Sequence, residues 1–506
     1  MTQPYEGGAP AGETVGPAKG IGLFGGAVLF GVMLWTGAPE GLNAPAWHTA
    51  AMGALMAVWW MTEAVPIPVT ALLPLALFPV LGIAGIRETA APYANPLVFL
   101  FLGGFVIAEG MQRWGLHRRI ALGIITRIGA RPGAIIAGFM AASAFLSMWV
   151  SNTATALMML PIGLSVVELT HAGAGEARAV RRPFAVALML GIAYACSIGG
   201  LGTLIGTPPN TLLAGFLSET YGYQIGFAQW MLVGLPLVAV GLPMTYFVLT
   251  RGVFRLRLTS LPGGRALLEE ERRRLGRMSG PEWKVAFVFA LVATLWMTRP
   301  LLSGVVPGLS DAGIAVFGAV VLFLLPADRR LSVPLMTWED AERLPWGVLV
   351  LFGGGLTLAS AINGTGLAAW IGEGLSGAGA WPLPLVVFAV TVTVILLTEL
   401  TSNTATAAAF LPIVASVAIG IGQNPLLFAI PAAVAASCAF MLPVATPPNA
   451  IVYGSGALKI SDMARAGIVL NVLFALLITL FAFTLFPLVF GIEAGVLPGW
   501  AGTPAP

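Results

Sequence analysis

The hexapeptide Ser-Asn-Thr-Ala-Thr-Ala occurs twice in this chain, and that repetition constrains the fold more than any other feature of the sequence. It occupies residues 151–156 and, 251 positions later, residues 402–407. The register of the repeat also holds upstream and downstream of the hexapeptide. A second signature, Thr-Pro-Pro-Asn, follows each copy at residues 207–210 and 446–449. The chain therefore consists of two related halves, each with a hydroxyl and amide cluster and a proline-broken segment.

Both halves are too apolar for a water-soluble domain. Hydrophobic residues make up 58% of the chain and charged residues only 9%, whereas a soluble domain carries about 25% charge. Apolar runs near the roughly 20 residues that cross a bilayer recur along the chain. The sequence therefore predicts an all-α polytopic membrane protein, with about 11 transmembrane helices plus two re-entrant hairpins.

Two apolar segments, residues 132–170 and 381–419, carry the repeated hexapeptide near their middle. Each is too long to cross the bilayer as one helix. Two half-helices that meet at a polar tip form a re-entrant hairpin, and such a tip is tolerated where protein or water satisfies its backbone. Two further segments, 184–217 and 425–455, are predicted to be broken helices, because their paired prolines remove backbone donors and cannot continue a helix.

The two hairpins are predicted to enter the membrane from opposite sides, because five crossings separate them in this assignment. With a cytoplasmic N-terminus, every Lys and Arg except Arg87 and Arg299 falls on the cytoplasmic side, in agreement with the positive-inside rule. The C-terminus then lies outside. Inverted repeats with broken helices that meet near the bilayer midplane are typical of secondary transporters.

The side chains of the duplicated cluster suit two kinds of ligand. Asn carbonyl and Ser/Thr hydroxyl oxygens, with backbone carbonyls freed at a helix break, coordinate a hard cation such as sodium. The hydroxyls, the Asn amide and the N-termini of half-helices donate to an anion. The predicted core contains no Lys or Arg in either half. Co-bound cations would therefore have to balance the charge of an anion, which couples the two ligands.

Other functions fit the sequence less well. A single Ser-Asn-Thr in a membrane helix usually bonds a neighbouring helix or its own backbone, but its duplication at two predicted tips favours a binding site. A membrane enzyme would need a His, Asp or Cys constellation, whereas the three histidines have no metal-ligand spacing and Cys196 and Cys438 are single. No basic stripe with interleaved aromatic residues indicates nucleic acid. A channel would not require two hairpins of mutually inverted topology.

A sodium/proton antiporter of similar architecture would need a titrating carboxylate at the midplane. Only Glu399, three residues before Ser402, lies near the predicted site. It could contact the site or act as a structural carboxylate inside the hairpin, and both roles stay open. Glu109 and Arg113 are expected to form an i, i+4 pair at a helix end, and Glu63 is expected at an interface.

These motifs resemble those of the divalent anion/sodium symporter (DASS) family. The likeness rests on the doubled Ser-Asn-Thr and Thr-Pro-Pro-Asn, on Trp-Met-Thr-Glu-Ala at residues 60–64, and on Met-Leu-Pro-Val-Ala-Thr-Pro-Pro-Asn at residues 441–449. It covers almost the whole chain after residue 20. The resemblance implies a sodium-coupled carrier or exchanger of di- and tricarboxylates, or of sulfate. It also implies a homodimer, with a scaffold domain at the interface and a transport domain that moves in an elevator fashion.

The resemblance further implies a division of the chain. The expected parts are a disordered N-terminal tail (1–20), scaffold helices (21–95), the first half of a transport domain (96–228), scaffold helices with a cytoplasmic loop at 251–284 (229–345), the second half of the transport domain (346–465), and a last transmembrane helix with a C-terminal tail (466–506).

Individual roles are implied in the same way. Carboxylate binding falls to Ser151, Asn152, Thr153, Thr207, Pro208, Ser402, Asn403, Thr404, Thr446 and Pro447. One sodium site would comprise Ser147, Ser151, Asn152 and the backbone near Gly199 and Gly200. The other would comprise Thr398, Thr401, Asn403 and the Ala445 carbonyl. The interval between the two motifs is longer in the first half, which leaves the exact backbone ligands there open.

The expected function is import of C4-dicarboxylates of the succinate, malate and fumarate class, coupled to sodium, by an elevator-type alternating-access mechanism. No basic side chain replaces a cation ligand at these positions, which favours symport. Sodium-independent dicarboxylate exchange, and citrate or sulfate transport, stay as alternatives. We expect sodium as the co-transported ion with no organic cofactor. We also expect a homodimer in the inner or plasma membrane, surrounded by lipid.

Overall fold

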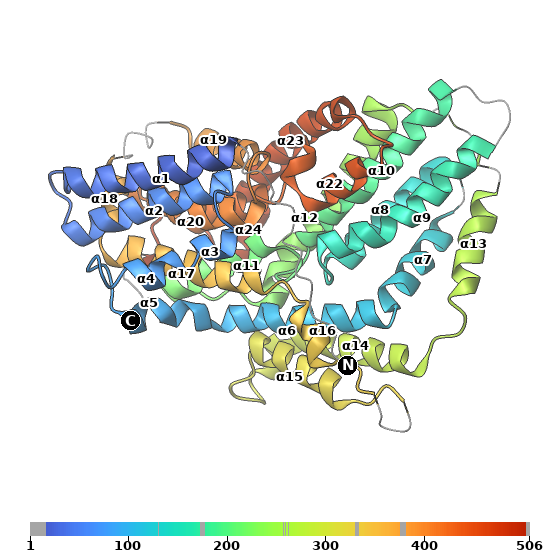
Figure 1. Ribbon diagram of the computed structural model, residues 1–506, viewed down its shortest axis with the longest axis horizontal. Coiled ribbons are helices and arrows are strands. Elements are labelled where there is room, and N and C mark those ends of the chain that lie inside the picture. The colour runs from blue at the N-terminus through green and yellow to red at the C-terminus, as the bar shows by residue number, and fades with distance from the viewer. Residues whose placement is uncertain are drawn as a thin grey trace, which may run out of the picture.

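The computed structural model describes residues 17–501, except 130, 173–177, 257, 259, 262, 329–332 and 375–380. Every element in these ranges is helical, apart from one isolated antiparallel bridge between Pro326 and Pro334. Nine of the described helices are long and apolar enough to cross a membrane, and five shorter apolar helices accompany them. The predicted all-α polytopic architecture is confirmed (Figure 1).

The helices follow the order of the two halves. Those of the first half are α1 (Pro17–Thr36), α2 (Ala44–Thr62), α3 (Ile67–Thr70), α4 (Leu73–Leu77), α5 (Ile86–Ala90), the 3₁₀ turn η1 (Ala91–Ala94), α6 (Pro96–Arg113), α7 (Leu116–Ile128), α8 (Pro132–Ser147), α9 (Asn152–Ala172), α10 (Arg178–Gly200), α11 (Pro208–Tyr221), α12 (Phe227–Phe247) and the π-helical turn η2 (Val248–Val253).

The second half continues from there. Its elements are α13 (Gly264–Arg274), α14 (Gly280–Leu302), α15 (Asp311–Leu324), α16 (Trp338–Glu342), α17 (Trp346–Gly364), α18 (Leu367–Gly374), α19 (Leu383–Thr398), α20 (Asn403–Gly420), α21 (Leu426–Ala435), the 3₁₀ turn η4 (Pro443–Ala445), α22 (Pro447–Gly454), α23 (Ile460–Phe483), α24 (Leu485–Phe490) and the 3₁₀ turn η5 (Gly499–Ala501).

Two helix boundaries differ from the expected ones. Helix α1 begins at Pro17, inside the segment predicted as a tail, and residues 1–16 of that segment lie outside the described residues. Helix α23 begins at Ile460 rather than near residue 466. The reason is a local cap, because the Lys459 backbone N–H donates to Asp462 Oδ2 over 3.0 Å and an acidic side chain at the third helical position stabilises a helix start.

The two hairpins are helix–turn–helix units in the same register. Helix α8 ends at Ser147 and α9 begins at Asn152; α19 ends at Thr398, 251 residues further on, and α20 begins at Asn403. The two arms of each unit contact each other. Ser402 precedes α20 in an extended conformation, which is the usual backbone of an N-cap serine. Four residues, the last of them a serine, therefore separate the two arms of each hairpin.

The two halves interlock through the second arms of these hairpins. Each first arm packs on the broken helix of its own half, α8 on α10 and α19 on α21. Each second arm also packs on the broken helix of the other half, α9 on α22 and α20 on α11. The tip of each hairpin therefore lies beside the helix breaks of both halves.

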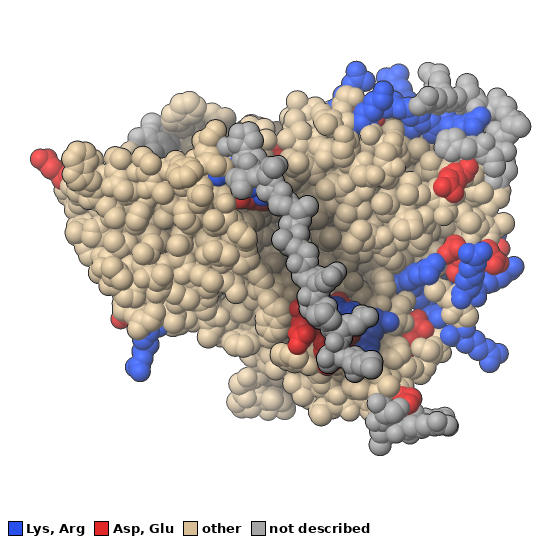
Figure 2. Space-filling model, in the orientation of Figure 1, with Lys and Arg blue, Asp and Glu red and all other residues tan. Residues whose placement is uncertain are grey.

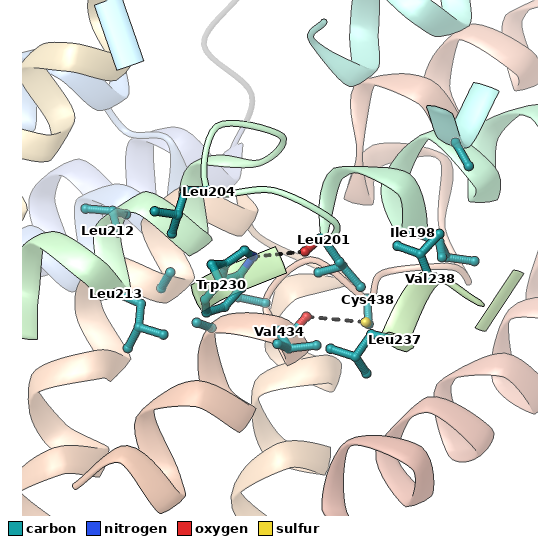
Figure 3. Packing of buried hydrophobic residues seen from close by; sticks show 14 of the residues in the cluster. Ile198, Leu201, Leu204, Leu212, Leu213, Trp230, Leu237, Val238, Val434 and Cys438 are labelled. Carbon is teal, nitrogen blue, oxygen red and sulfur yellow. Dashed lines mark hydrogen bonds between the residues drawn. The ribbon is translucent and has the colours of Figure 1, made fainter. Parts of the chain in front are cut away.

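Buried side chains from both halves fill the space behind the breaks. Figure 3 shows the labelled cluster, which comprises Ile198, Leu201, Leu204, Leu212, Leu213, Trp230, Leu237, Val238, Val434 and Cys438. Trp230 of α12 is fully buried, and its Nε1–H donates to the Leu201 carbonyl over 3.0 Å. This bond satisfies a carbonyl at the end of α10, which the helix itself leaves free.

Replacing Trp230 with alanine is expected to lower the free energy of unfolding by ~3–5 kcal/mol, because it removes the largest side chain of this cluster and its hydrogen bond. The measurement is the thermal unfolding midpoint of the purified protein in detergent. Trp283→Ala is the matched control, since the Trp283 side chain is 63% exposed. Equal midpoints for the two variants would contradict the packing role of Trp230.

Charged residues gather at one end of the molecule. On the face shown in Figure 2, most Lys and Arg residues lie toward the end where Figure 1 places α7, α10 and α13. Arg118 of α7 pairs with Glu271 of α13 over 2.6 Å. Arg299, one of the two exceptions to the charge rule, pairs with Asp311 over 2.8 Å. Its charge is therefore balanced by a partner within the protein.

Candidate functional site

A cavity of about 1340 Å³ lies where the hairpin tips meet the helix breaks. Both tips contribute their Ser-Asn-Thr, and both breaks contribute their threonine and the following proline. The lining includes all ten residues predicted to bind an anion, which are Ser151, Asn152, Thr153, Thr207, Pro208, Ser402, Asn403, Thr404, Thr446 and Pro447. The structure therefore brings together side chains that are up to 296 residues apart in the sequence, from Ser151 to Pro447.

An equivalent hydrogen bond, from a hydroxyl to the asparagine five residues later, spans the tip of each hairpin. In the first half, Ser147 Oγ donates to Asn152 Oδ1. In the second half, Thr398 Oγ1 lies 2.8 Å from both Asn403 Oδ1 and the Ala436 carbonyl oxygen. Three oxygen atoms thus share one hydroxyl proton at the second tip. An oxygen-only cluster of this kind fits a hard cation such as sodium.

The break in each half is held by the asparagine of Thr-Pro-Pro-Asn. Asn210 Nδ2 donates to the carbonyls of Gly200 and Thr203, over 3.1 and 2.8 Å. Asn449 Nδ2 donates to the carbonyls of Ala439 and Leu442, over 3.2 and 3.1 Å. These carbonyls have lost their helical partners at the break, so a buried amide replaces them. Neither Asn210 nor Asn449 is among the predicted site residues, although both belong to the duplicated Thr-Pro-Pro-Asn motif.

The oxygens of both asparagines are left without a donor. Asn210 Oδ1 and Asn449 Oδ1 are buried, and neither has a hydrogen-bond partner. Since Nδ2 is fixed by two carbonyls in each case, a flip of the amide group would not improve the bonding. The same unpaired acceptor therefore stands at both breaks. Each oxygen can accept a bond from water or contact a cation.

Two residues of the first predicted cation site, Asn152 and Gly200, lie beside each other. A Cβ built on Gly200 would lie 3.1 Å from Asn152 Oδ1 and 2.9 Å from the Gly206 carbonyl oxygen. Glycine is therefore needed for the Asn152 amide to approach this backbone. Gly199 packs against the backbone of Ala144 in α8. The Cα of Gly199 therefore faces α8 rather than the cavity.

The second predicted cation site is assembled less completely. Thr398 and Asn403 are in contact, and Ala445 lines the cavity. The Thr401 hydroxyl, however, lies 2.6 Å from Thr406 Oγ1 and 2.9 Å from the Leu397 carbonyl oxygen. Thr401 also lines the cavity, and a hydroxyl that donates one bond keeps lone pairs that can contact a cation.

The charged residues of the cavity come from neither the tips nor the breaks. Lys19 of α1, Glu63 at the end of α2, Glu109 of α6 and Arg343 at the end of α16 line it. Glu63, which the sequence placed at an interface, faces this cavity from a left-handed backbone conformation with φ of 46°. Two cationic and two anionic groups have no formal net charge. The tips and breaks themselves are neutral.

The expected ion pair between Glu109 and Arg113 is replaced by a longer-range one. Arg113 of α6 pairs with Asp340 of α16. Asp340 is fixed for this contact, because it also accepts from the Thr337 backbone N–H over 2.8 Å. A carboxylate held at a helix start competes better for the guanidinium than a side chain one turn away on the same helix.

Two duplicated hairpins that share one neutral cavity inside an apolar helical body define a secondary membrane transporter rather than an enzyme. The chain belongs to the family described as the sodium:sulfate symporter transmembrane region, whose model matches residues 19–492. The resemblance to the divalent anion/sodium symporters is thereby confirmed.

Relatives with a stated activity support the same grouping. The chain is 44% identical over 479 residues to the sodium-dependent dicarboxylate transporter SdcS of Staphylococcus aureus (strain USA300), covering 94% of this chain and 92% of that protein. It is also 44% identical over 482 residues to SdcS of Staphylococcus saprophyticus, with the same coverage.

Solved structures agree at the level of the fold. The chain is similar to the YdaH transporter of Alcanivorax borkumensis, with a TM-score of 0.55 and 14% identity over 88% of this chain and 100% of that one. It is also similar to MtrF of Neisseria gonorrhoeae, with a TM-score of 0.57 and 14% identity over 90% and 98%. At such identities the likeness supports the polytopic helical fold alone.

Proposed function

We propose that this protein imports C4-dicarboxylates of the succinate, malate and fumarate class together with sodium ions. The observation that carries the proposal is the convergence of four helix starts on one neutral cavity. Helices α9, α11, α20 and α22 begin at Asn152, Pro208, Asn403 and Pro447, and all four of these residues line it. The stated activity of the SdcS relatives, sodium-dependent dicarboxylate transport, supports the same proposal.

Four helix N-termini suit a dianion with two carboxylates. The free N–H groups of a helix start carry the equivalent of about +0.5 charge, so the four helix starts favour an anion although they add no net charge to the site. The hydroxyls and amides of the two tips can donate to the carboxylate oxygens. Because dipoles and hydroxyls bind more weakly than a buried Arg, the anion can also leave. Each of the two mirrored tips then holds one carboxylate.

Sodium ions complete the charge balance of this site. The first would bind at Ser147, Ser151 and Asn152 with the backbone near Gly199 and Gly200. The second would bind at Thr398, Thr401 and Asn403 with the Ala445 carbonyl. Asn152 and Asn403 each belong to an anion site and a cation site, which couples the two ligands. Binding of sodium therefore orders the tip that receives the carboxylate.

Transport would proceed by movement of the hairpins and broken helices as one body, within residues 96–228 and 346–465. The interlocking of α9 with α22 and of α20 with α11 supports such a unit. Helix α17 packs on both α11 and α20, which supports its inclusion in this unit, and the segments outside these two ranges would form the scaffold. A homodimer in the plasma membrane would hold that scaffold fixed.

The cavity would open to the cytoplasm in this conformation. With a cytoplasmic N-terminus and an external C-terminus, Lys19, Glu63, Glu109 and Arg343 all lie at the cytoplasmic ends of their helices. These charged residues line the cavity, which makes it accessible from that side. The described conformation is then the one that releases substrate.

The proposal is tested by uptake of radiolabelled succinate into proteoliposomes, with an inward sodium gradient and with potassium in its place. Sodium-dependent uptake is the expected result. Uptake that needs internal dicarboxylate but no sodium would establish an exchanger instead. Citrate and sulfate are the competitors to include, because the family description names sulfate. Sodium-driven uptake of radiolabelled sulfate, with no uptake of succinate, would replace the dicarboxylate assignment.

A further inference from the structure

Glu399 is a buried carboxylate at the tip of the second hairpin that the transport mechanism above does not use. It follows Thr398 directly, is 3% exposed and does not line the cavity. Its Oε1 accepts from the backbone N–H groups of Phe440 and Met441, over 2.6 and 2.8 Å. Its Oε2 accepts from those of Met441 and Leu442, over 3.0 and 3.1 Å. The side chain thus clamps three consecutive amides of the second helix break.

A further donor reaches the same carboxylate from a third part of the chain. Asn471 Nδ2 of α23 donates to Glu399 Oε1 over 2.8 Å. All of these partners are N–H donors, so the carboxylate acts only as an acceptor and its ionised form fits them. A buried charge of this kind is tolerated because several polar hydrogens replace its water. Glu399 therefore connects the hairpin, the break and α23 through one fixed negative charge.

Among the described residues of the first half, no carboxylate makes an equivalent clamp. The residue 251 positions before Glu399 is Met148. In the first break, the Leu201 and Gly202 N–H groups donate to the carbonyls of Ile198 and Gly199, over 3.1 and 2.9 Å. These two amides are therefore bonded to carbonyls within the same turn, so they need no side-chain carboxylate. The two otherwise mirrored half-sites differ at this point.

The clamp acts on the segment that supplies the second cation site. The Leu442 backbone N–H donates to Glu399 Oε2, and the Leu442 carbonyl accepts from Asn449 Nδ2. The next residues are the turn η4, which ends at Ala445 in the lining of the cavity. On the other side, Thr398 precedes Glu399 and touches Asn403. Glu399 therefore fixes the distance between the two parts of the second site.

We propose that Glu399 is a positioning residue that assembles the second sodium site and gives it a negative charge that the first site lacks. The inference rests on the proposed function, because it assigns a role within sodium-coupled transport. It distinguishes the two sodium sites: the second holds its ion more tightly than the first. Glu399 acts through the backbone that it holds and through its charge, and it touches neither substrate nor cavity.

The test compares Glu399→Gln with the wild type in proteoliposomes. A glutamine has nearly the same shape, but its NH2 group cannot accept from the backbone amides. The sodium concentration for half-maximal succinate uptake is expected to rise by about tenfold or more. The maximal rate at saturating sodium is expected to stay within about threefold of the wild type. A merely structural role would lower the rate and leave the sodium requirement unchanged.

Two further variants make the test decisive. Glu168→Gln is the matched control, because it neutralises an exposed carboxylate on α9, and it is expected to match the wild type. Asn471→Leu removes one donor to Glu399 and leaves the hairpin intact, so a smaller shift of about threefold is expected. If Glu399→Gln cannot be purified, the sodium requirement of Asn471→Leu tests the proposal in its place.

The outcomes separate the inference from the proposed function. An unchanged sodium requirement in folded Glu399→Gln, or in Asn471→Leu where only that variant folds, would overturn the inference while wild-type uptake still needed sodium. Wild-type uptake that needs no sodium would overturn the proposed function and the inference together. Thermal midpoints of each variant, measured in sodium and in choline, report sodium binding without transport. A smaller sodium-induced stabilisation in Glu399→Gln than in the wild type is the expected result.

Discussion

Replacing Asn403 with alanine is expected to reduce succinate uptake by about 100-fold or more while the protein still folds. Asn403 begins α20 and lines the cavity, and its Oδ1 lies 2.8 Å from Thr398 Oγ1. Because Asn403 is proposed to serve both the anion site and the second cation site, one truncation would remove bonds to two charged ligands. The measurement is the initial rate of sodium-driven uptake in proteoliposomes.

The mirrored variant extends this prediction. Asn152→Ala is expected to cause a loss of the same order, because Asn152 occupies the equivalent position 251 residues earlier and pairs with Ser147. Asn363→Ala is the matched control on α17, since Asn363 does not line the cavity. Size-exclusion profiles establish that all three variants fold. Near wild-type uptake by either cavity variant would remove that asparagine from the site.

Replacing Gly200 with alanine is expected to reduce the affinity of the first cation site severely. A Cβ at this position would lie 2.9 Å from the Gly206 carbonyl oxygen and 3.1 Å from Asn152 Oδ1. Neither the backbone nor the amide, which Ser147 fixes, can move without disturbing the predicted ligands. The sodium concentration for half-maximal uptake is expected to rise by about tenfold or more, because overpacking typically costs ~1–3 kcal/mol.

Gly31→Ala separates this effect from a general cost of replacing glycine in a helix. Gly31 lies in α1, and a Cβ there would meet no atom within 4 Å. Its sodium dependence is expected to equal that of the wild type. An unchanged sodium requirement in Gly200→Ala would mean that Asn152 does not bind a cation beside Gly200.

The exact repeat explains why so much of the site was predictable. Both copies of the hexapeptide mark a position where an apolar helix has to stop, and proline cannot continue the helix at either break. These are local effects of side-chain chemistry, so hairpins and breaks follow from the sequence. The clustering of Ser151, Asn152, Ser402 and Asn403 around one cavity then follows from the symmetry of the two halves.

Contacts between distant segments could not be predicted in the same way. Nothing in the sequence near Glu399 indicates that its partners are the amides of residues 440–442 and Asn471. The pairing of Arg113 with Asp340 is equally remote, and the local alternative, Glu109, was the wrong choice. Such contacts depend on how helices pack, and neither helix spacing nor helix propensity contains that information.

Binding of succinate to the purified protein by titration calorimetry, with and without sodium, tests the central claim most directly. That claim is that a neutral cavity binds a dianion only when cations occupy the adjoining sites. We expect saturable binding in sodium and no measurable binding in an equal concentration of choline. Binding of equal affinity in both solutions would contradict it, because the cavity would then hold the dianion without cations.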